Sequence, residues 1–283
     1  MLRILNLGAG VQSSAVLLMS VQGDLPKLDH AIFADTGDEP LEVYQWLDFL
    51  TPICAEAGIA LHVVRSPKGT MSEYVVKQHQ SGKRVECPPL FTQGDDGRAT
   101  PINRSCTREW KIDPIRRATK KILGLNPRDR WPKQLAVETW LGISGDEKMR
   151  MKVSTEPWQR FWHPLIEDEW EPGGKWAQMR MPSIHRAGCL EWMHRNGYPP
   201  PPRSACWHCR FRSNEEWRHL RDTDPEAFEQ ACDYDDNIRG GKLFHGMRKP
   251  VYVHRSLVPL READLGNEAP GLFDDECFGI CGV

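Results

Sequence analysis

Cysteines and glycines occur in two patterns that could carry chemistry. Cys206 and Cys209 form a Cys-x-x-Cys pair after a run of prolines, and two thiolates at this spacing can bind one metal ion or cluster without backbone strain. The segment Gly8–Ser14 holds glycines followed by serines. Glycines let a backbone approach an anion closely, and the N–H groups at the start of a following helix favour phosphate. The sequence therefore offers one candidate thiolate site and one candidate phosphate site.

The first third of the chain alternates apolar runs with helical patterns. Strands are predicted at 3–7, 29–34 and 59–64, with helices at 11–21 and 41–57 between them. This alternation implies right-handed crossovers and an α/β fold, with a doubly wound parallel sheet covered by helices on both faces. The glycine segment then lies at the carboxyl edge of the sheet, where ligands bind in such folds.

The rest of the chain is more varied. Residues 66–103 are expected to form a long irregular insertion, which in a compact domain is usually functional. Further elements are predicted as a basic helix at 107–123, a buried strand at 134–143, a helix at 186–196 and two helices within 214–238. We expect a nucleotide-binding domain over 1–170 and a smaller, mostly helical, cysteine-containing region over 171–283.

The glycine segment alone does not identify a ligand. A dinucleotide-binding fold requires a third glycine where Ser13 stands, and a Walker A loop requires a Gly-Lys pair that the segment lacks. A tight turn that binds nothing has the same pattern, and Asp35, at the end of the second predicted strand, could be a simple helix cap. These alternatives remain open on the residues alone.

Three segments in order resemble the PAPS-reductase (phosphoadenosine phosphosulfate reductase) branch of the PP-loop, or adenine nucleotide alpha-hydrolase, superfamily. They are 7–14, 33–44 and 142–150. The chain departs from the superfamily pattern at Gln12, Ser144 and Lys148. The resemblance implies a Rossmann-like fold of the PP-loop (HUP) type that binds ATP or a related adenylate, with Mg²⁺ as an optional companion. The implied nucleotide-binding residues are Gly8, Gly10, Gln12, Ser13, Ser14, Asp35, Thr36, Gly37, Gly142, Asp146 and Arg150.

A further resemblance concerns metal binding. The segment that holds Cys106, Lys111 and Pro114 is similar to a cysteine–lysine–proline segment of sulfonucleotide reductases. In their iron–sulfur members this region joins a later Cys-x-x-Cys around a [4Fe–4S] cluster. The expected ligands here are Cys106, Cys189, Cys206 and Cys209. Structural zinc on the same residues, with His208 as a further donor, is the alternative, and a redox pair is a third.

The carboxyl terminus and the basic helix supply the expected catalytic residues. Cys277 follows Glu276, as does the thiol in the Glu-Cys-Gly tail of PAPS reductases that attacks sulfur, although Phe278 interrupts the pattern here. Cysteines in a frayed tail without any function fit the sequence equally well. Lys111 is expected to serve the nucleotide or a sulfonate.

Composition sets limits on partners and location. The formal net charge of −2 gives no general attraction to nucleic acid or membranes. No apolar run reaches membrane-spanning length and no export signal is evident, so a cytoplasmic protein with reduced cysteines is expected. Local basic stretches, Arg116–Lys121 and Arg210–Arg221, could track a nucleic acid backbone or be ordinary solvated helix faces.

Two functions follow. The first is a PP-loop enzyme of the ATP pyrophosphatase or sulfotransferase–reductase type. It would transfer or reduce sulfur with an iron–sulfur cluster, and a nucleic acid substrate and a thiol or sulfur-donor protein would be its partners. The alternative is a nucleotide-sensing or nucleic-acid-binding accessory module with structural zinc and no turnover. Neither the acceptor nor the oligomeric state is predicted.

Overall fold

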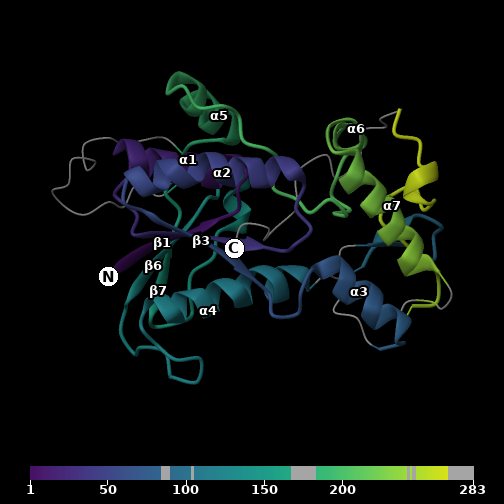
Figure 1. The fold of residues 1–283 in the computed structure, drawn as a ribbon, viewed down its shortest axis with the longest axis horizontal. Coiled ribbons are helices and arrows are strands. Elements are labelled where there is room, and N and C mark those ends of the chain that lie inside the picture. Colours follow the sequence, from purple (N-terminus) through teal and green to yellow (C-terminus); the bar gives the residue numbers. More distant parts are fainter. Residues whose placement is uncertain (84–89, 103–104, 167–182, 241–242, 244–246, 267–283) are drawn as a thin grey trace.

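A parallel sheet of five strands forms the centre of the molecule (Figure 1). The computed structural model describes residues 1–83, 90–102, 105–166, 183–240, 243 and 247–266. The strands of the main sheet are β1 (Leu2–Leu7), β2 (His30–Asp35), β3 (Ala60–Arg65), β6 (Val137–Leu141) and β7 (Gln159–Trp162), in the spatial order β3-β2-β1-β6-β7. Every neighbouring pair in it is parallel.

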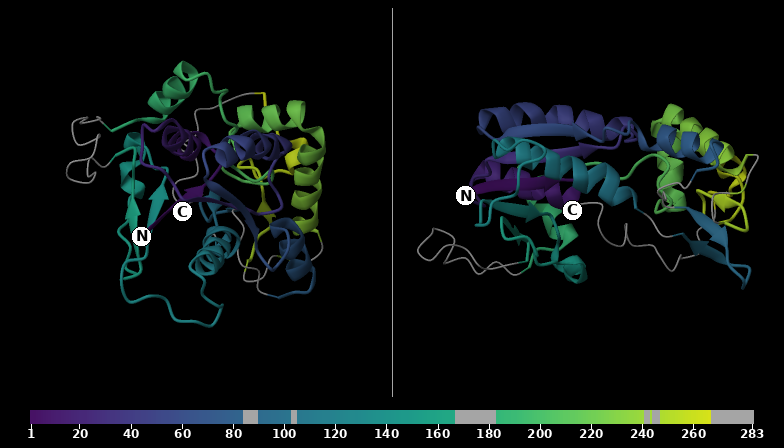
Figure 2. Two further views of the ribbon diagram at one scale, coloured as in Figure 1. Left: turned by 60° about the vertical axis from the view of Figure 1, so that its left-hand side comes forward. Right: turned by 90° about the horizontal axis from the view of Figure 1, so that it is seen from below.

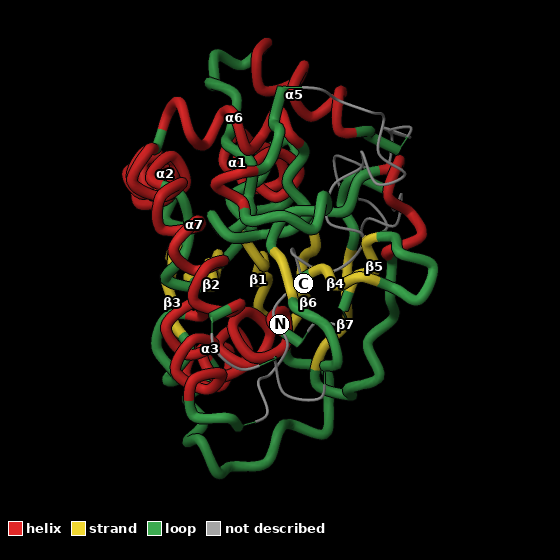
Figure 3. Tube along the Cα trace, turned by 90° about the vertical axis from the view of Figure 1, so that its right-hand side faces the viewer, coloured by secondary structure: helices red, strands yellow, loops and turns green. Residues whose placement is uncertain are grey.

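Helices cover both faces of this sheet. Helices α1 (Val11–Gln22) and α2 (Leu41–Glu56) lie on one face and α4 (Asp113–Ile122) on the other (Figure 1). Viewed from the side, the strands lie between the two layers (Figure 3). Ile4 and Leu5 on β1 are both fully buried, although their side chains point to opposite faces. This burial is what a parallel sheet covered on both sides requires, and the predicted doubly wound α/β fold is confirmed.

The strand order creates a switch point beside β1. The chain runs from β1 to β2 and β3 on one side, and then returns so that β6 pairs with β1 on the other side. The loops that leave the carboxyl ends of β1 and β6 therefore lie side by side at the same edge of the sheet. Such a switch point is the usual position of the ligand crevice in open α/β sheets.

The segment predicted as an irregular insertion includes regular secondary structure. It contains α3 (Met71–Gln80) and a hairpin of β4 (Phe91–Gln93) and β5 (Ala99–Pro101), which β8 (Val251–Tyr252) extends. Thr70 caps α3 by accepting a hydrogen bond from the Glu73 N–H. The prediction also missed β7, whose four residues are too short to show a period of their own.

A second core lies beside the sheet. It joins α3 and the hairpin to α6 (Asn214–Thr223) and α7 (Pro225–Arg239). A capping box of Ser213 and Glu216 begins α6, and Asp224 caps α7. Helix α5 (Arg186–Arg195) instead packs on α1 in the core of the main sheet (Figure 2). The two cores thus draw on both sides of the predicted 170/171 boundary, which itself lies outside the described residues.

Among the helices of the described segments, none combines the length and the apolar character needed to cross a bilayer.

Candidate functional site

The turn after β1 has the geometry of a compact loop at a helix N-terminus. Ala9 adopts a positive φ of 59°, which few residues other than glycine adopt. The Ser13 hydroxyl accepts a hydrogen bond from the Gly8 N–H at 3.1 Å and donates one to the Gly10 carbonyl at 3.4 Å. α1 begins at Val11 directly after this turn. The positive end of the α1 dipole therefore lies at the switch point beside β1.

The loop after β6 packs directly against this turn. A Cβ atom added at Gly142 would lie 2.6 Å from the Ser13 nitrogen and 3.0 Å from the Gln12 carbonyl carbon. Only glycine permits an approach this close. Gln12 in turn donates hydrogen bonds to the Ser144 hydroxyl at 3.4 Å and to Glu147 at 3.3 Å. The two loops thus form one unit at the carboxyl edge of the sheet.

Glu147 connects the Gly8–Ser14 loop to a cation. Its carboxylate pairs with the Arg150 guanidinium while also accepting from Gln12. The Arg150 side chain is largely buried, and its Nε has no hydrogen-bond partner among the described residues. A positive charge is therefore held one side chain away from the start of α1.

A segment just before the Cys-x-x-Cys pair packs against the turn after β1. The Ser204 hydroxyl donates to the Gly8 carbonyl, and a Cβ atom at Gly10 would lie 3.2 Å from the Ser204 Cβ. Residues separated by almost two hundred positions thus meet at the amino-terminal turn. This contact places the Cys206 segment beside the candidate phosphate site.

Asp35 shapes the turn that follows β2. One carboxylate oxygen accepts from the Gly37 N–H at 2.7 Å and the Tyr44 hydroxyl at 3.0 Å, and the other pairs with Arg65 at 2.6 Å. Gly37 has a φ of 80°, and an added Cβ would lie 2.6 Å from a side-chain carbon of Thr70. The buried Asp35 carboxylate therefore holds the turn in place by contacts on both of its oxygens.

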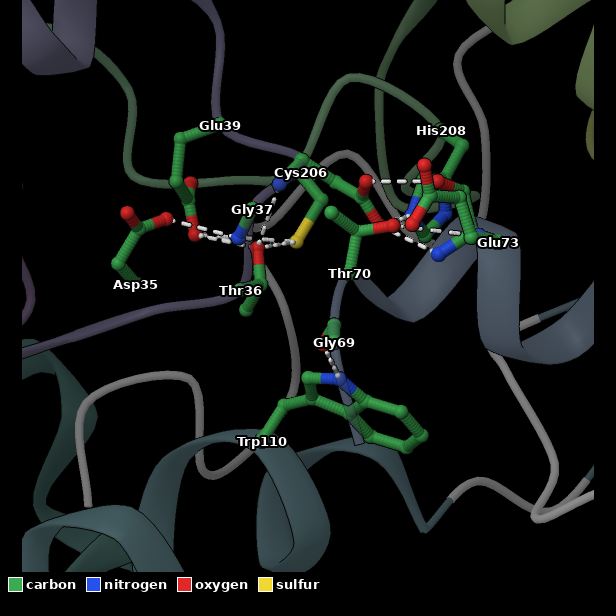
Figure 4. Close-up of polar contacts among 12 residues, drawn as sticks. Asp35, Thr36, Gly37, Glu39, Gly69, Thr70, Glu73, Trp110, Cys206 and His208 are labelled. Carbon is green, nitrogen blue, oxygen red and sulfur yellow. Dashed lines mark hydrogen bonds and ion pairs between the residues drawn. The ribbon is translucent and has the colours of Figure 1, made fainter. Parts of the chain in front are cut away.

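Thr36, Glu39 and Cys206 form a buried polar group next to that turn (Figure 4). The Thr36 hydroxyl lies 3.0 Å from a Glu39 oxygen and 3.2 Å from the Cys206 sulfur. The Cys206 sulfur is 3.8 Å from the same Glu39 oxygen, and the other Glu39 oxygen has no partner within the described segments. A thiol and a carboxyl group are thereby brought together across 167 residues of sequence.

Burial controls the ionisation of this group. Desolvation raises the pKa of Glu39, while the nearby Lys111 charge lowers it in part. Desolvation and then the Glu39 charge raise the pKa of the Cys206 thiol well above its ordinary value, again opposed by Lys111. Cys206 is therefore a neutral thiol at neutral pH in this structure, and Lys111 is the cation that favours its ionised form.

A second buried pair lies on the other side of the turn. His208 Nε2 is 2.9 Å from an Asp38 oxygen, and Ser72 donates to Asp38 from both its N–H and its hydroxyl at 2.7 Å. The Trp207 N–H donates to the Asp38 carbonyl at 2.8 Å. His208 is fully buried, and its Nδ1 lacks a partner in the described part of the chain. The Cys-x-x-Cys loop is thus fastened to the β2 turn through its backbone and its histidine.

The four expected metal ligands are not brought together. Cys106, Cys206 and Cys209 lie in the second core, whereas Cys189 lies on α5 in the core of the main sheet. The side chains that influence the pKa of Cys189 are Asp146, Arg186 and Glu147. Among the described residues, no group of three or more His, Cys, Asp or Glu side chains has a geometry that could hold a metal ion. Neither a [4Fe–4S] cluster nor zinc on those four cysteines fits this arrangement.

The expected nucleotide-binding residues fall mainly into two groups. Contacts between the loops after β1 and β6 bring together Gly8, Gly10, Gln12, Ser13, Gly142 and Arg150, whereas Asp35, Thr36 and Gly37 form the turn after β2. Two others have different partners: the buried Ser14 hydroxyl accepts from the Trp46 indole at 2.9 Å, and Asp146 accepts from the Arg186 N–H at the start of α5. Cys277 lies outside the described residues.

Asp38, Glu39 and Ser204 are site residues that no pattern in the sequence singles out. A Thr-x-x-Glu spacing from Thr36 to Glu39 is visible in the sequence, but such spacing is common at helix starts. The long-range contacts of Asp38 and Ser204 have no local signal. With the geometry established, comparison with known proteins adds no identification, since the chain matches no protein-family model and no curated protein shows significant similarity to it.

Proposed function

We propose that this protein is an adenine-nucleotide-binding enzyme of the PAPS-reductase-like type, acting on ATP or a sulfated adenylate. The phosphates would bind at the start of α1, within Gly8–Ser14. The observation that carries the proposal is the meeting of this loop with Gly142 at the switch point. Oxyanions favour helix N-termini with exposed backbone N–H groups, and this crevice is where open α/β sheets bind nucleotides.

The charge arrangement supports an anionic ligand. Arg150 stands beside Gln12 through Glu147, and Lys111 lies close enough to Cys206 and Glu39 to influence the pKa of both. A nucleotide phosphate that displaced Glu147 from Arg150 would gain a charge-assisted hydrogen bond. Arg150 is thus the proposed phosphate cation, and Lys111 the proposed partner of a sulfonate or of a developing thiolate.

The thiol of Cys206 supports sulfur chemistry. It lies beside the β2 turn, next to the segment in which Ser204 contacts the phosphate loop. A thiol needs to lose its proton to act as a nucleophile, and the adjacent Glu39 carboxylate is in position to accept it. In this proposal Lys111 stabilises the resulting thiolate.

The proposal is tested by calorimetric titration with ATP and with a sulfated adenylate. Arg150→Gln should weaken binding of both by at least about tenfold, the effect of one lost charge-assisted contact. Arg160→Gln is the matched control, because Arg160 is an exposed cation paired with Glu138 away from the crevice. Equal affinities in the two variants would refute the assignment of the phosphate site.

Measuring product release distinguishes the proposed enzyme from a nucleotide-sensing module, which would bind nucleotide without turnover. The wild-type protein, supplied with a dithiol, should release sulfite from a sulfated adenylate or pyrophosphate from ATP, and Cys206→Ala should abolish sulfite release while nucleotide binding persists. Tight binding without either product would favour the sensing function.

A further inference from the structure

Helix α4 and the loop that follows it carry a concentrated positive charge. Residues 116–133 contain seven Lys or Arg side chains and a single acid, Asp129, in a chain whose formal net charge is −2. We define the basic surface by its five exposed cations: Arg117, Lys121, Arg128, Arg130 and Lys133. The charge is therefore a local feature of this segment.

The loop that carries three of these cations is tied to α4. Lys120 donates to the carbonyls of Pro127 and Asp129, at 2.8 and 2.5 Å. Trp131 stacks on Trp158 with ring centroids 3.9 Å apart, and the Arg116 guanidinium lies over both rings. Two of the seven basic side chains thus anchor the loop, which carries three of the five exposed cations; the other two, Arg117 and Lys121, lie on α4 itself.

The five cations lack acidic partners. Within the described part of the chain, none of them forms an ion pair, whereas the nearby acids are already engaged. Asp129 accepts from the backbone N–H and the side chain of Asn126, and Glu156 accepts from Arg116 and Trp158. Five cations with Asp129 as the single acid in the segment leave a surplus of positive charge, which an external polyanion would neutralise.

We infer that this basic surface binds the phosphate backbone of a nucleic acid. Three of its cations are arginines, whose planar guanidinium groups match phosphate oxygens. An anionic membrane would be the other polyanion of this size, but membrane-surface helices also bury apolar side chains. Between residues 116 and 133 no large apolar side chain is exposed, and Leu135, two residues further on, is a single exposed apolar side chain rather than the apolar face of a membrane-surface helix, which favours a nucleic acid.

The position of α4 relates this surface to the proposed enzyme site. Lys111, which lies close enough to Cys206 to influence its pKa, precedes α4, and the ten residues of α4 lead from there to the loop with three of the cations. At about 1.5 Å per residue the helix spans about 15 Å, or roughly four base-pair rises of duplex DNA. A nucleic acid on the surface could therefore extend into the crevice as the acceptor substrate, a step that rests on the proposed function.

The test measures binding of the full chain to fluorescein-labelled duplex DNA, and to matching single strands of DNA and RNA, at several salt concentrations. The test variant is Arg128→Glu/Arg130→Glu/Lys133→Glu. The control, Lys27→Glu/Lys77→Glu/Lys83→Glu, makes the same charge change at exposed lysines outside the surface. We expect the test variant to lose at least about tenfold in affinity, and its slope of log K against log salt to fall by about 2 to 3, because about 0.9 is lost per phosphate contact.

Each outcome decides the inference. Equal losses in both variants, or wild-type protein that binds phosphatidylserine vesicles and no nucleic acid, would overturn it. ATP titration of the same samples separates the two proposals, because the test variant should bind ATP as the wild type does. A wild type that binds nucleic acid through this surface but no adenine nucleotide would support the surface and refute the proposed enzyme function.

Discussion

Replacing Gly142 with alanine tests the close contact on which the proposed phosphate site depends. The added Cβ would lie 2.6 and 2.7 Å from the nitrogen and Cα of Ser13. Ordinary contacts between such atoms are about 3.5 Å or more, so one backbone must move by most of an ångström. The atoms in the way belong to the first turn of α1 and cannot rotate aside as a flexible side chain would.

The cost can be estimated from this overlap. Overpacking of a tightly packed site typically destabilises a protein by about 1–3 kcal/mol. For a chain of this size, each kcal/mol lowers the melting temperature by roughly 2–4 °C. A shift of the α1 turn also misplaces the N–H groups that would hold phosphate, so affinity for ATP should fall by at least about tenfold, or roughly 1.4 kcal/mol.

Differential scanning fluorimetry with and without ATP measures both effects. Gly240→Ala is the matched control, because the nearest atom to its added Cβ is a carbonyl oxygen at 3.4 Å, an ordinary contact. The expected result is a lower melting temperature for Gly142→Ala and a smaller increase on addition of ATP than in the control. A Gly142→Ala protein with wild-type stability and wild-type ATP response would refute the packing of the two loops.

Three further variants test neighbouring features. Ser13→Ala should weaken ATP binding, whereas Ser14→Ala should mainly lower stability, by about 1–3 kcal/mol in urea unfolding, because it leaves the buried Trp46 N–H without an acceptor; the reverse pattern would contradict the geometry of the turn. Cys189→Ala should leave the iron and zinc content of anaerobically purified protein unchanged, as measured by plasma mass spectrometry, because Cys189 lies in a separate core; a loss of metal would show that the cysteines do assemble. His254→Gln should reduce acid sensitivity, because burial lowers the pKa of His254 from 6.5 to about 4. The unfolded state then binds a proton that the folded state does not, so wild-type stability falls as the pH drops below about 6.5, by about 2 kcal/mol at pH 5. A variant whose stability depends on pH as the wild type's does would show that His254 is not the cause of the acid sensitivity.

The fold was largely predictable because each of its first strands and helices forms from residues that are close together in the sequence. Strands predicted at 3–7, 29–34 and 59–64 lie within a residue of β1, β2 and β3, since short apolar runs between glycine- and proline-containing turns carry their own signal. Helix α3 was not predicted. Most of its residues are polar and only three are buried, so its apolar stripe is too narrow to stand out in the sequence, and packing against α7 gives it much of its support.

The candidate site was only partly predictable. The glycine turn and the β2 turn lie directly after strands, so their place at the carboxyl edge follows from the topology. The pairing of Asp38 with His208 spans 170 residues, and no periodicity in one sequence encodes such a contact. For the same reason the surroundings of Cys189 were not predicted. Helix α5, which carries Cys189, is close to the Cys-x-x-Cys pair in sequence but packs in the core of the main sheet.

The most direct test of the central claim is a crystal structure of the protein grown with ATP or a sulfated adenylate. We predict nucleotide phosphates at the first turn of α1, within hydrogen-bonding distance of the backbone N–H groups between Gly8 and Ser14. A nucleotide bound elsewhere, or an empty crevice at saturating nucleotide, would contradict it.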